Sequence, residues 1–364
     1  MKKILFLSAH LFFSKRKVSF HHLAKAALKK KYEVTFVTVP NSLFSFIGDF
    51  KNTYNRIKSI YYGIKILKIN KLRVSSYFSV FHDTPKLKLS NIFNLFFLFG
   101  YSKAFKSKYD IIIFDSTVSL YLYDSLKKKN QNAHFIYRVS DDLAMLKQTL
   151  KLQQKECEII NNFNLVSTPS DNLTRKLLKR QSISTKLKTH YHGINTKVFS
   201  EDHRNPYDTS MVNLIFVGVG GLDEFFISFV KSLQEQKENY IFHFIGPISN
   251  TFSSKNSIFY GELKFEETIP FIKFANIGVQ IKNFTEGIDV LEKSLKIIQY
   301  SYCKLPIISP KYLGLKGENN FYYNQSYMSI KLAINKALSF NRSNYDNSWV
   351  SDWDTVLENI LIDN

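Results

Sequence analysis

The chain has 364 residues, of which 45% are hydrophobic, and a formal net charge of +20. This length allows two domains of ordinary size, and the hydrophobic share excludes a disordered or fibrous protein. The excess of basic residues favours anionic partners such as phosphorylated substrates, acidic lipids or nucleic acid. The two cysteines, Cys157 and Cys303, are far apart, which excludes a disulfide framework or a zinc-binding spacing and fits a reducing cytoplasm.

The first part of the chain alternates strands and helices. We expect an apolar strand at Ile4–Ser8, a helix at Val18–Lys31 and a second strand at Glu33–Val39. This order predicts a parallel sheet with right-handed crossovers. The opening residues imitate a signal peptide, but no small-residue cleavage site follows, so we interpret them as the start of this fold. The loop after the first strand has no glycine, which argues against a dinucleotide bound there.

Basic and aromatic residues alternate between Asn41 and Phe105. This mixture is typical of a membrane interface, where ammonium groups meet lipid phosphates, and it also suits a nucleic-acid surface or buried helices with solvated lysines. No compact motif for DNA or RNA is present, so we expect no nucleic-acid partner. The longest apolar run, Ile92–Gly100, is too short to span a bilayer. We expect membrane or acceptor contacts from four lysines: Lys58, Lys65, Lys68 and Lys71.

Two carboxylates follow a predicted strand in the middle of the chain. Tyr109–Asp115 is near-continuously apolar and is expected to be central, and His134–Val139 is a strand that runs into Ser140, Asp141 and Asp142. Open α/β sheets place their chemistry at the carboxyl ends of strands, where a carboxylate can act as general base. The alternative is structural, with Ser140 capping a helix whose first turn carries both acids.

A second strand–helix series begins after a polar stretch. We expect a first domain at residues 1–198, a linker at 199–210, a second domain at 211–345 and a final amphipathic helix within 346–364. The strand Asn213–Val217 enters a glycine-rich turn and then a helix from Glu224. The turn runs through Gly218, Gly220 and Gly221 toward Asp223. It would bring unencumbered backbone N–H groups to a phosphate, although a tight turn alone would need the same glycines.

The stretch Glu292–Pro310 is expected to form a helix followed by an apolar strand, Leu305–Ser309. Lys296, Gln299 and Tyr300 recur at spacings of three and four and so share one helix face. A lysine and an amide near a helix N-terminus suit a diphosphate and a ribose. The alternative is an ordinary amphipathic helix with a solvated lysine.

Several strings occur in an order that resembles the xanthan glucuronosyltransferase GumK family: YRVSDDLAML, HGINTKVF, FVGVGGLDEFF and SLKIIQYSYCKLPIIS. The resemblance implies an α/β protein of the GT-B class, with two Rossmann-like domains whose parallel sheets face across a cleft and a final helix that packs back on the first domain. It also implies inverting, metal-independent transfer of a sugar from a UDP-sugar to a lipid-diphosphate-linked oligosaccharide, in surface polysaccharide synthesis at the inner face of the cell membrane. The UDP-sugar is a substrate, and no cofactor is expected.

The resemblance also implies roles for individual residues. One of Asp141 and Asp142 is the catalytic base, with Asp141 favoured. The donor-binding residues are Gly218, Gly220, Gly221, Asp223, Glu262, Leu295, Lys296 and Gln299. The string IGVQIKN departs from the proline-tyrosine common after that strand, and Leu295 stands where the family has methionine. Both departures concern the donor sugar, so glucuronate is one possible donor among several.

Two other classes of function stay open from the sequence. A UDP-sugar epimerase can share the GT-B fold and would release a free nucleotide-sugar product. A non-enzymatic basic protein would bind acidic lipid or nucleic acid in a salt-reversible way, without affinity for UDP.

Overall fold

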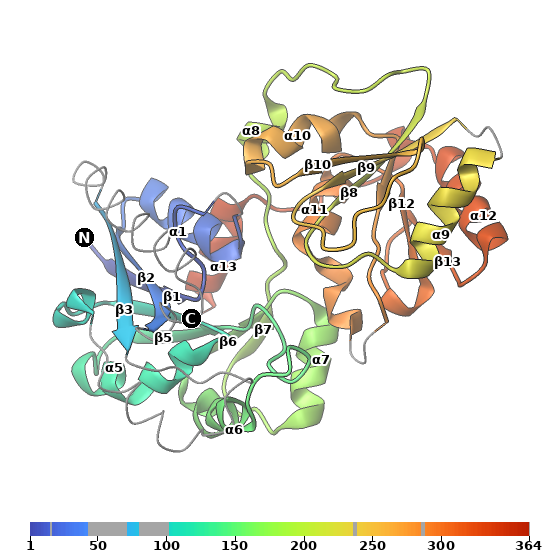
Figure 1. Cartoon of the computed structure of the whole chain (residues 1–364). Helices are drawn as coiled ribbons and strands as arrows, with labels where there is room; N and C mark the ends of the chain where they lie inside the picture. The colour runs from blue at the N-terminus through green and yellow to red at the C-terminus, as the bar shows by residue number, and fades with distance from the viewer. Residues whose placement is uncertain (15–16, 43–70, 80–101, 236–238, 285–287, 364) are drawn as a thin grey trace. The chain divides into compact units, whose positions relative to one another are not determined.

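The computed structural model describes residues 1–14, 17–42, 71–79, 102–235, 239–284 and 288–363 (Figure 1). They form two compact units: the first comprises Met1–Tyr191 and Trp353–Asn364, and the second His192–Asp352. The stretch expected to be a linker, residues 199–210, lies in the second unit, where Phe199 and Tyr207 are buried in its core.

The first unit contains a seven-stranded sheet in the order β3-β2-β1-β4-β5-β6-β7, and every neighbouring pair is parallel. All five residues of β4 are buried, which explains the apolar run Ile111–Phe114 of this central strand before it ends in the buried Asp115. The strands are β1 (Lys3–Ser8), β2 (Glu33–Ser42), β3 (Leu72–Ser79), β4 (Ile111–Asp115), β5 (His134–Arg138), β6 (Leu165–Thr168) and β7 (Leu187–Thr189). The helices are α1 (Ser19–Lys29), α5 (Tyr123–Lys129), α6 (Leu150–Ile159), α7 (Asp171–Arg180) and α13 (Trp353–Ile362).

The last helix, α13, packs on α1 within the first unit. The rings of His22 and Trp353 stack with centroids 5.1 Å apart, and Lys29 forms an ion pair with Asp354. Lys30 forms a second ion pair, with Glu358. The chain thus returns to the first unit after completing the second. None of the described helices has the length and apolar character to cross a membrane.

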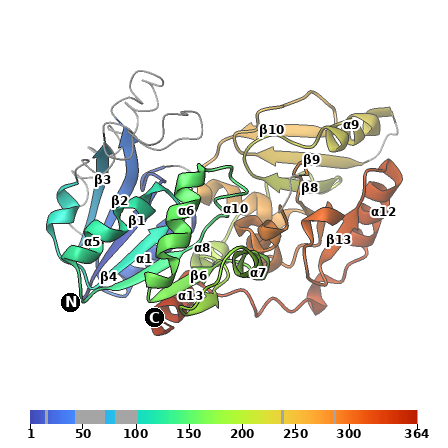
Figure 2. The same cartoon turned by 90° about the horizontal axis from the view of Figure 1, so that it is seen from below.

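The second unit contains a six-stranded parallel sheet in the order β10-β9-β8-β11-β12-β13, and Figure 2 shows β10, β9 and β8 side by side. Along β8, Leu214 and Phe216 enter one core while Ile215 enters another, so both faces of the sheet are covered. The strands are β8 (Val212–Val217), β9 (Tyr240–Ile245), β10 (Ser257–Gly261), β11 (Ile277–Val279), β12 (Ile307–Pro310) and β13 (Asn320–Tyr323). The helices are α8 (Thr196–Ser200), α9 (Glu224–Ser232), α10 (Phe265–Phe274), α11 (Leu295–Tyr302) and α12 (Tyr327–Leu338). Two parallel sheets with helices confirm the predicted α/β class.

The two segments that connect the units are bonded to each other where they enter the second unit. Ile194 and Asp352 form an isolated parallel bridge, and the Ile194 N–H donates to the Ser351 carbonyl at 3.0 Å. The Asp352 carboxylate also accepts the Thr196 hydroxyl at 2.8 Å. The incoming and outgoing chain are therefore fastened together at this point.

Tyr300 fixes helix α11 against strand β8. Its side chain is fully buried, and its hydroxyl donates to the Ile215 carbonyl and accepts the Val217 N–H, both at 3.1 Å. Gly278 in β11 makes room for the ring, because a Cβ there would lie 2.5 Å from Cδ2 of Tyr300. Helix α11 is thereby held beside the carboxyl-terminal half of β8.

Gly246 allows the end of β9 to meet the turn after β8. Its φ of +126° is a conformation that L side chains rarely adopt, and a Cβ at this position would lie 1.7 Å from the Gly218 carbonyl oxygen. Since the carbonyl oxygen belongs to the backbone and the position of a Cβ is fixed by its own main chain, no side-chain rotation could relieve the clash. A glycine is required here to keep the two strand ends in contact.

We predict that Gly246→Ala lowers the free energy of unfolding by more than about 3 kcal/mol, because it combines backbone strain with this clash. Gly261→Ala is the matched control: its φ is also positive, at +68°, but nothing lies within 4 Å of the added carbon, so the cost should be about 1 kcal/mol. Urea unfolding followed by circular dichroism measures both. Equal losses for the two variants would contradict the predicted clash.

Candidate active site

The glycine turn between β8 and α9 is folded against its neighbours. The N–H of Gly218 donates to the Ile245 carbonyl at 2.9 Å, and that of Gly220 to the Pro247 carbonyl at 3.2 Å. The N–H of Leu222 donates to Oδ1 of Asn250 at 2.7 Å. The expectation of unencumbered N–H groups is therefore wrong for Gly218 and Gly220, because the last residue of β9 and the loop that follows it already accept these two amides.

Two lysine ammonium groups lie at this turn. Lys296, the second residue of α11, extends over the Phe216 ring with Nζ 4.1 Å from the centroid, and a Cβ on Gly218 would lie 2.7 Å from the same Nζ. Nζ of Lys282 lies 3.9 Å from where a Cβ of Gly220 would be. Lys296 was predicted from the sequence but Lys282 was not, although its position three residues after the end of β11 was a signal for it. Together they make the turn electropositive.

The other expected donor-binding residues also lie in the second unit. Asp223 caps α9, its carboxylate accepting the Phe226 N–H at 2.9 Å. Glu262 is exposed just after β10, and Gly261 at the end of that strand accepts the Gly246 N–H at 2.8 Å. Leu295 and Gln299 are partly buried on α11. The contacts bring Gly218, Gly220 and Lys296 together, whereas Gly221 lies beside Ser249 and Asn250.

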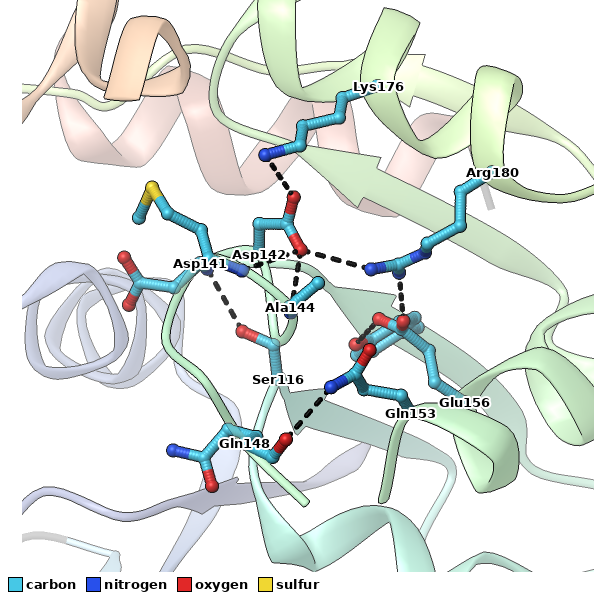
Figure 3. Close-up of polar contacts among 11 residues, drawn as sticks. Ser116, Asp141, Asp142, Ala144, Gln148, Gln153, Glu156, Lys176 and Arg180 are labelled. Atoms are coloured by element: carbon cyan, nitrogen blue, oxygen red, sulfur yellow. Dashed lines mark hydrogen bonds and ion pairs between the residues drawn. The ribbon is translucent and has the colours of Figure 1, made fainter. Parts of the chain in front are cut away.

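In the first unit, the two adjacent aspartates after β5 have different surroundings (Figure 3). Asp142 is 1% exposed and is held by ion pairs with Lys176 at 2.8 Å and Arg180 at 3.0 Å. Its carboxylate also accepts the Ala144 N–H at 2.8 Å. Burial alone would raise the pKa of Asp142, but these cations and this N–H outweigh it, so the pKa is lowered.

Arg180 extends the Asp142 contacts into the unit. Its second terminal nitrogen forms an ion pair with Glu156 on α6, and Glu156 accepts the Tyr137 hydroxyl at 2.5 Å. Burial raises the pKa of Glu156, although the charge of Arg180 opposes the shift. The loop after β5 is thus tied to α6 and α7 through Asp142. Helix α6 begins only at Leu150, so Ser140 does not cap a helix at this point.

Asp141 is partly exposed, and Figure 3 shows its carboxylate pointing away from Lys176 and Arg180. Its backbone N–H donates to Oγ of Ser116 at 3.0 Å, which fixes the main chain at this residue. Of the two candidate bases, Asp142 is committed to ion pairs. Asp141 stays the candidate for proton transfer.

The lysines expected to contact a membrane or acceptor fall mostly outside the described residues, as Lys58, Lys65 and Lys68 do. Lys71 is exposed immediately before β3, with Nζ 3.4 Å from Sδ of Met1.

Comparison with known proteins connects this geometry to a family. Residues 6–169 match the family model described as the glucuronosyltransferase GumK N-terminal domain. The chain is 25% identical over 258 residues to the UDP-glucuronate:glycolipid 2-beta-glucuronosyltransferase of Xanthomonas campestris pv. campestris. That alignment covers 68% of this chain and 62% of the relative's length.

Solved structures share the whole fold at low sequence identity. HepE of Anabaena in complex with UDP and glucose superposes with a TM-score of 0.64 at 12% identity, over 100% of this chain and 99% of that one. The lipopolysaccharide outer core galactosyltransferase WaaB superposes with a TM-score of 0.56 at 14% identity, over 99% of each chain. The resemblance drawn from the sequence is confirmed: this chain resembles the GumK glucuronosyltransferases and has the GT-B fold, with two Rossmann-like units.

Proposed function

We propose that this protein is a glycosyltransferase that moves a sugar from a UDP-sugar to a lipid-diphosphate-linked oligosaccharide. The observation that carries the proposal is the position of Lys296, whose ammonium group lies at the glycine turn after β8. Open α/β sheets bind nucleotides at the carboxyl ends of their strands, and a lysine there supplies a point charge for a diphosphate. The relative acts, by its name, on UDP-glucuronate and a glycolipid.

The second unit binds the donor in this proposal. Because the Gly218 and Gly220 amides are occupied, Lys296 and Lys282 provide most of the positive charge, with a smaller contribution from the first turn of α11. Negative charge grows on the UDP oxygen as its bond to the sugar breaks, and fixed cations stabilise it. We propose that the lysines do this without a divalent metal ion.

The first unit activates the acceptor in this proposal. The Asp141 carboxylate takes the proton from the acceptor hydroxyl while that oxygen forms a bond to the anomeric carbon of the donor sugar. The bond from this carbon to the diphosphate oxygen breaks, and UDP leaves with the electron pair. This single displacement inverts the anomeric configuration. Asp142, with its lowered pKa and ion pairs, holds the loop instead of accepting the proton.

The donor sugar we favour is glucuronate. The relative's name supports it, and so does the second lysine at the turn, because Lys282 adds a cation that a neutral sugar would not require. The net charge of +20 supports a further part of the proposal, peripheral association with an anionic membrane surface at its cytoplasmic face, where a lipid-linked acceptor would be found.

The direct test of the proposal is a thermal-shift screen of UDP-sugars, followed by incubation with short polyprenyl-diphosphate-linked oligosaccharides. A ligand that binds the folded state raises the melting temperature, and mass spectrometry detects the extended glycolipid. Isomerised UDP-sugar without acceptor would indicate an epimerase. Absence of any UDP-dependent shift would refute the donor site.

We predict that Lys296→Ala weakens UDP binding by about 10- to 100-fold, because it removes a charge-assisted interaction with the diphosphate. Lys255→Ala, an exposed lysine in the loop before β10, is the control and should bind UDP like the wild type. Isothermal titration calorimetry measures both affinities. Unchanged affinity in Lys296→Ala would remove this residue from the site.

We predict opposite results for the two neighbouring aspartates. Asp141→Asn should reduce transfer at least about 100-fold while UDP affinity and stability persist, because only the base is lost. Asp142→Asn should instead lower the free energy of unfolding by about 1–2 kcal/mol, since it removes the buried carboxylate charge that pairs with the partly exposed Lys176 and Arg180.

The stability loss in Asp142→Asn should depend on pH. A carboxyl group with a lowered pKa contributes stability at neutral pH and loses it as the pH falls through its folded-state pKa. The difference in the free energy of unfolding between wild type and Asp142→Asn should therefore shrink in acid.

For the other aspartate, normal transfer by Asp141→Asn would exclude Asp141 as the base.

A further inference from the structure

A row of buried polar side chains crosses the carboxyl edge of the first sheet. Neighbouring strands pair Ser8 with Thr38, Asp115 with Arg138, and Arg138 with Ser167. Residues paired in this way point to the same face of a parallel sheet. All five are at most 3% exposed, in a position that apolar residues usually occupy. Burying such a row costs free energy unless its groups are hydrogen-bonded to one another or to their neighbours.

Asp115 is the only carboxylate in this row of five. Its side chain accepts the Ser8 hydroxyl at 2.9 Å and the Ser116 N–H at 3.0 Å. Burial raises the pKa of Asp115 to about 6, against the opposing effects of the Ser140 and Ser8 hydroxyls, the Ser116 N–H and the charge of Arg138. The group is thus ionised at neutral pH but close to its protonation range.

The buried cation of Arg138 favours the ionised form of Asp115. Its guanidinium donates through Nη1 to the Ser167 hydroxyl at 2.7 Å and to the Thr168 carbonyl at 3.0 Å. Its Nε and Nη2 have no hydrogen-bond partner within the part of the chain that the structure describes. Burial lowers the pKa of Arg138 to about 9, and the Asp115 charge acts against this shift. Loss of that charge would leave a fully buried cation without compensation.

The end of β4 connects this buried charge to the candidate base. The Asp115 carbonyl accepts the Thr117 N–H at 2.8 Å and the Ser119 hydroxyl at 3.2 Å, so the turn after β4 is rigidly bonded. Between these contacts lies Ser116, whose hydroxyl accepts the Asp141 N–H at 3.0 Å (Figure 3). A continuous chain of contacts therefore runs from the sheet interior to the backbone of Asp141.

We propose that Asp115 is a positioning residue, which fixes the backbone of Asp141 through Ser116 and so sets the placement of the catalytic base. The inference rests on the proposed function, because it requires Asp141 to act as the base. Its physical basis is that a shift of about 1 Å in a reacting group can reduce the rate about 100-fold. Asp115 itself touches no substrate.

The groups that face Asp115 decide how pH affects the loop. They are the hydroxyls of Ser8 on β1 and Ser140 on the loop after β5, and the Arg138 cation on β5, with the Tyr137 phenol close enough to interact. Below pH of about 6, Asp115 gains a proton and becomes neutral. The carboxylate that accepts the Ser116 N–H and compensates Arg138 is then lost, which loosens the chain of contacts to Asp141.

The test compares Asp115→Asn with Asp110→Asn, which removes an exposed carboxylate from the amino end of the same segment. With UDP-glucuronate and an acceptor oligosaccharide that supports turnover, Asp115→Asn should lower kcat about 10- to 100-fold with KM for the donor unchanged. The fall of kcat between pH 7 and pH 5 should be present in wild type and Asp110→Asn and flattened in Asp115→Asn. Wild-type kcat and pH profile in Asp115→Asn would overturn the inference.

Ser116→Ala and Ser116→Thr keep the test decisive if Asp115→Asn does not fold. Hydrogen exchange of the peptide containing Asp141 should be about 10-fold faster in Ser116→Ala and restored in Ser116→Thr, which keeps a hydroxyl acceptor. Unchanged exchange in Ser116→Ala would overturn the inference. This measurement needs no turnover, so its outcome is separate from that of the proposed function, which fails if the wild type transfers no sugar.

Discussion

The hydroxyl group of Tyr300 determines the geometry of the candidate donor site. By bonding to the main chain at both Ile215 and Val217, it holds α11 at one height along β8. Lys296 lies one turn earlier on the same helix, so its ammonium group falls beside Gly218 and not elsewhere along the strand. The buried Tyr300 hydroxyl therefore helps to set the distance between the Lys296 ammonium group and the turn at Gly218.

The first unit shows how two identical side chains, adjacent in sequence, acquire separate tasks. Asp142 points into a set of cations and backbone donors that keep it ionised, and it thereby becomes part of the framework. Asp141 points away from Lys176 and Arg180 and is the residue to which the proposed function assigns proton transfer. The division depends on α7, because Lys176 and Arg180 lie one turn apart on that helix and reach the same carboxylate. The surroundings of Asp141 and Asp142, and not their residue type, distinguish these two side chains.

The sequence was sufficient to predict the central strands of both sheets but not the strands at their edges. Strands such as β4 and β8 are covered on both faces and show as unbroken apolar runs, whereas the missed strands are β3, β7, β10 and β13, which all end a sheet. An edge strand has fewer buried side chains and so a weaker pattern. The helix expected from Glu292 begins instead at Leu295, after a short 3-10 segment, Ile288–Lys293.

Residues of the candidate site were predictable only where the pattern within one segment of sequence was enough to identify them. Spacing alone placed Lys296 near a helix start, but the proximity of Lys282 depends on how the loop after β11 folds toward Gly220. The occupied amides of the glycine turn were mispredicted for the same reason, since their acceptors at Ile245 and Pro247 lie more than twenty residues along the chain. The separation of Asp141 from Asp142 likewise required knowledge of α7.

The chain crosses between the two units twice, and this has a consequence for limited proteolysis. Because the polypeptide leaves the first unit after Tyr191 and re-enters it at Trp353, each unit is tethered to the other by two covalent connections. A protease that severs one of them leaves the other intact, and the bridge between Ile194 and Asp352 keeps the severed end beside its neighbour. Nicked protein would therefore stay one molecule.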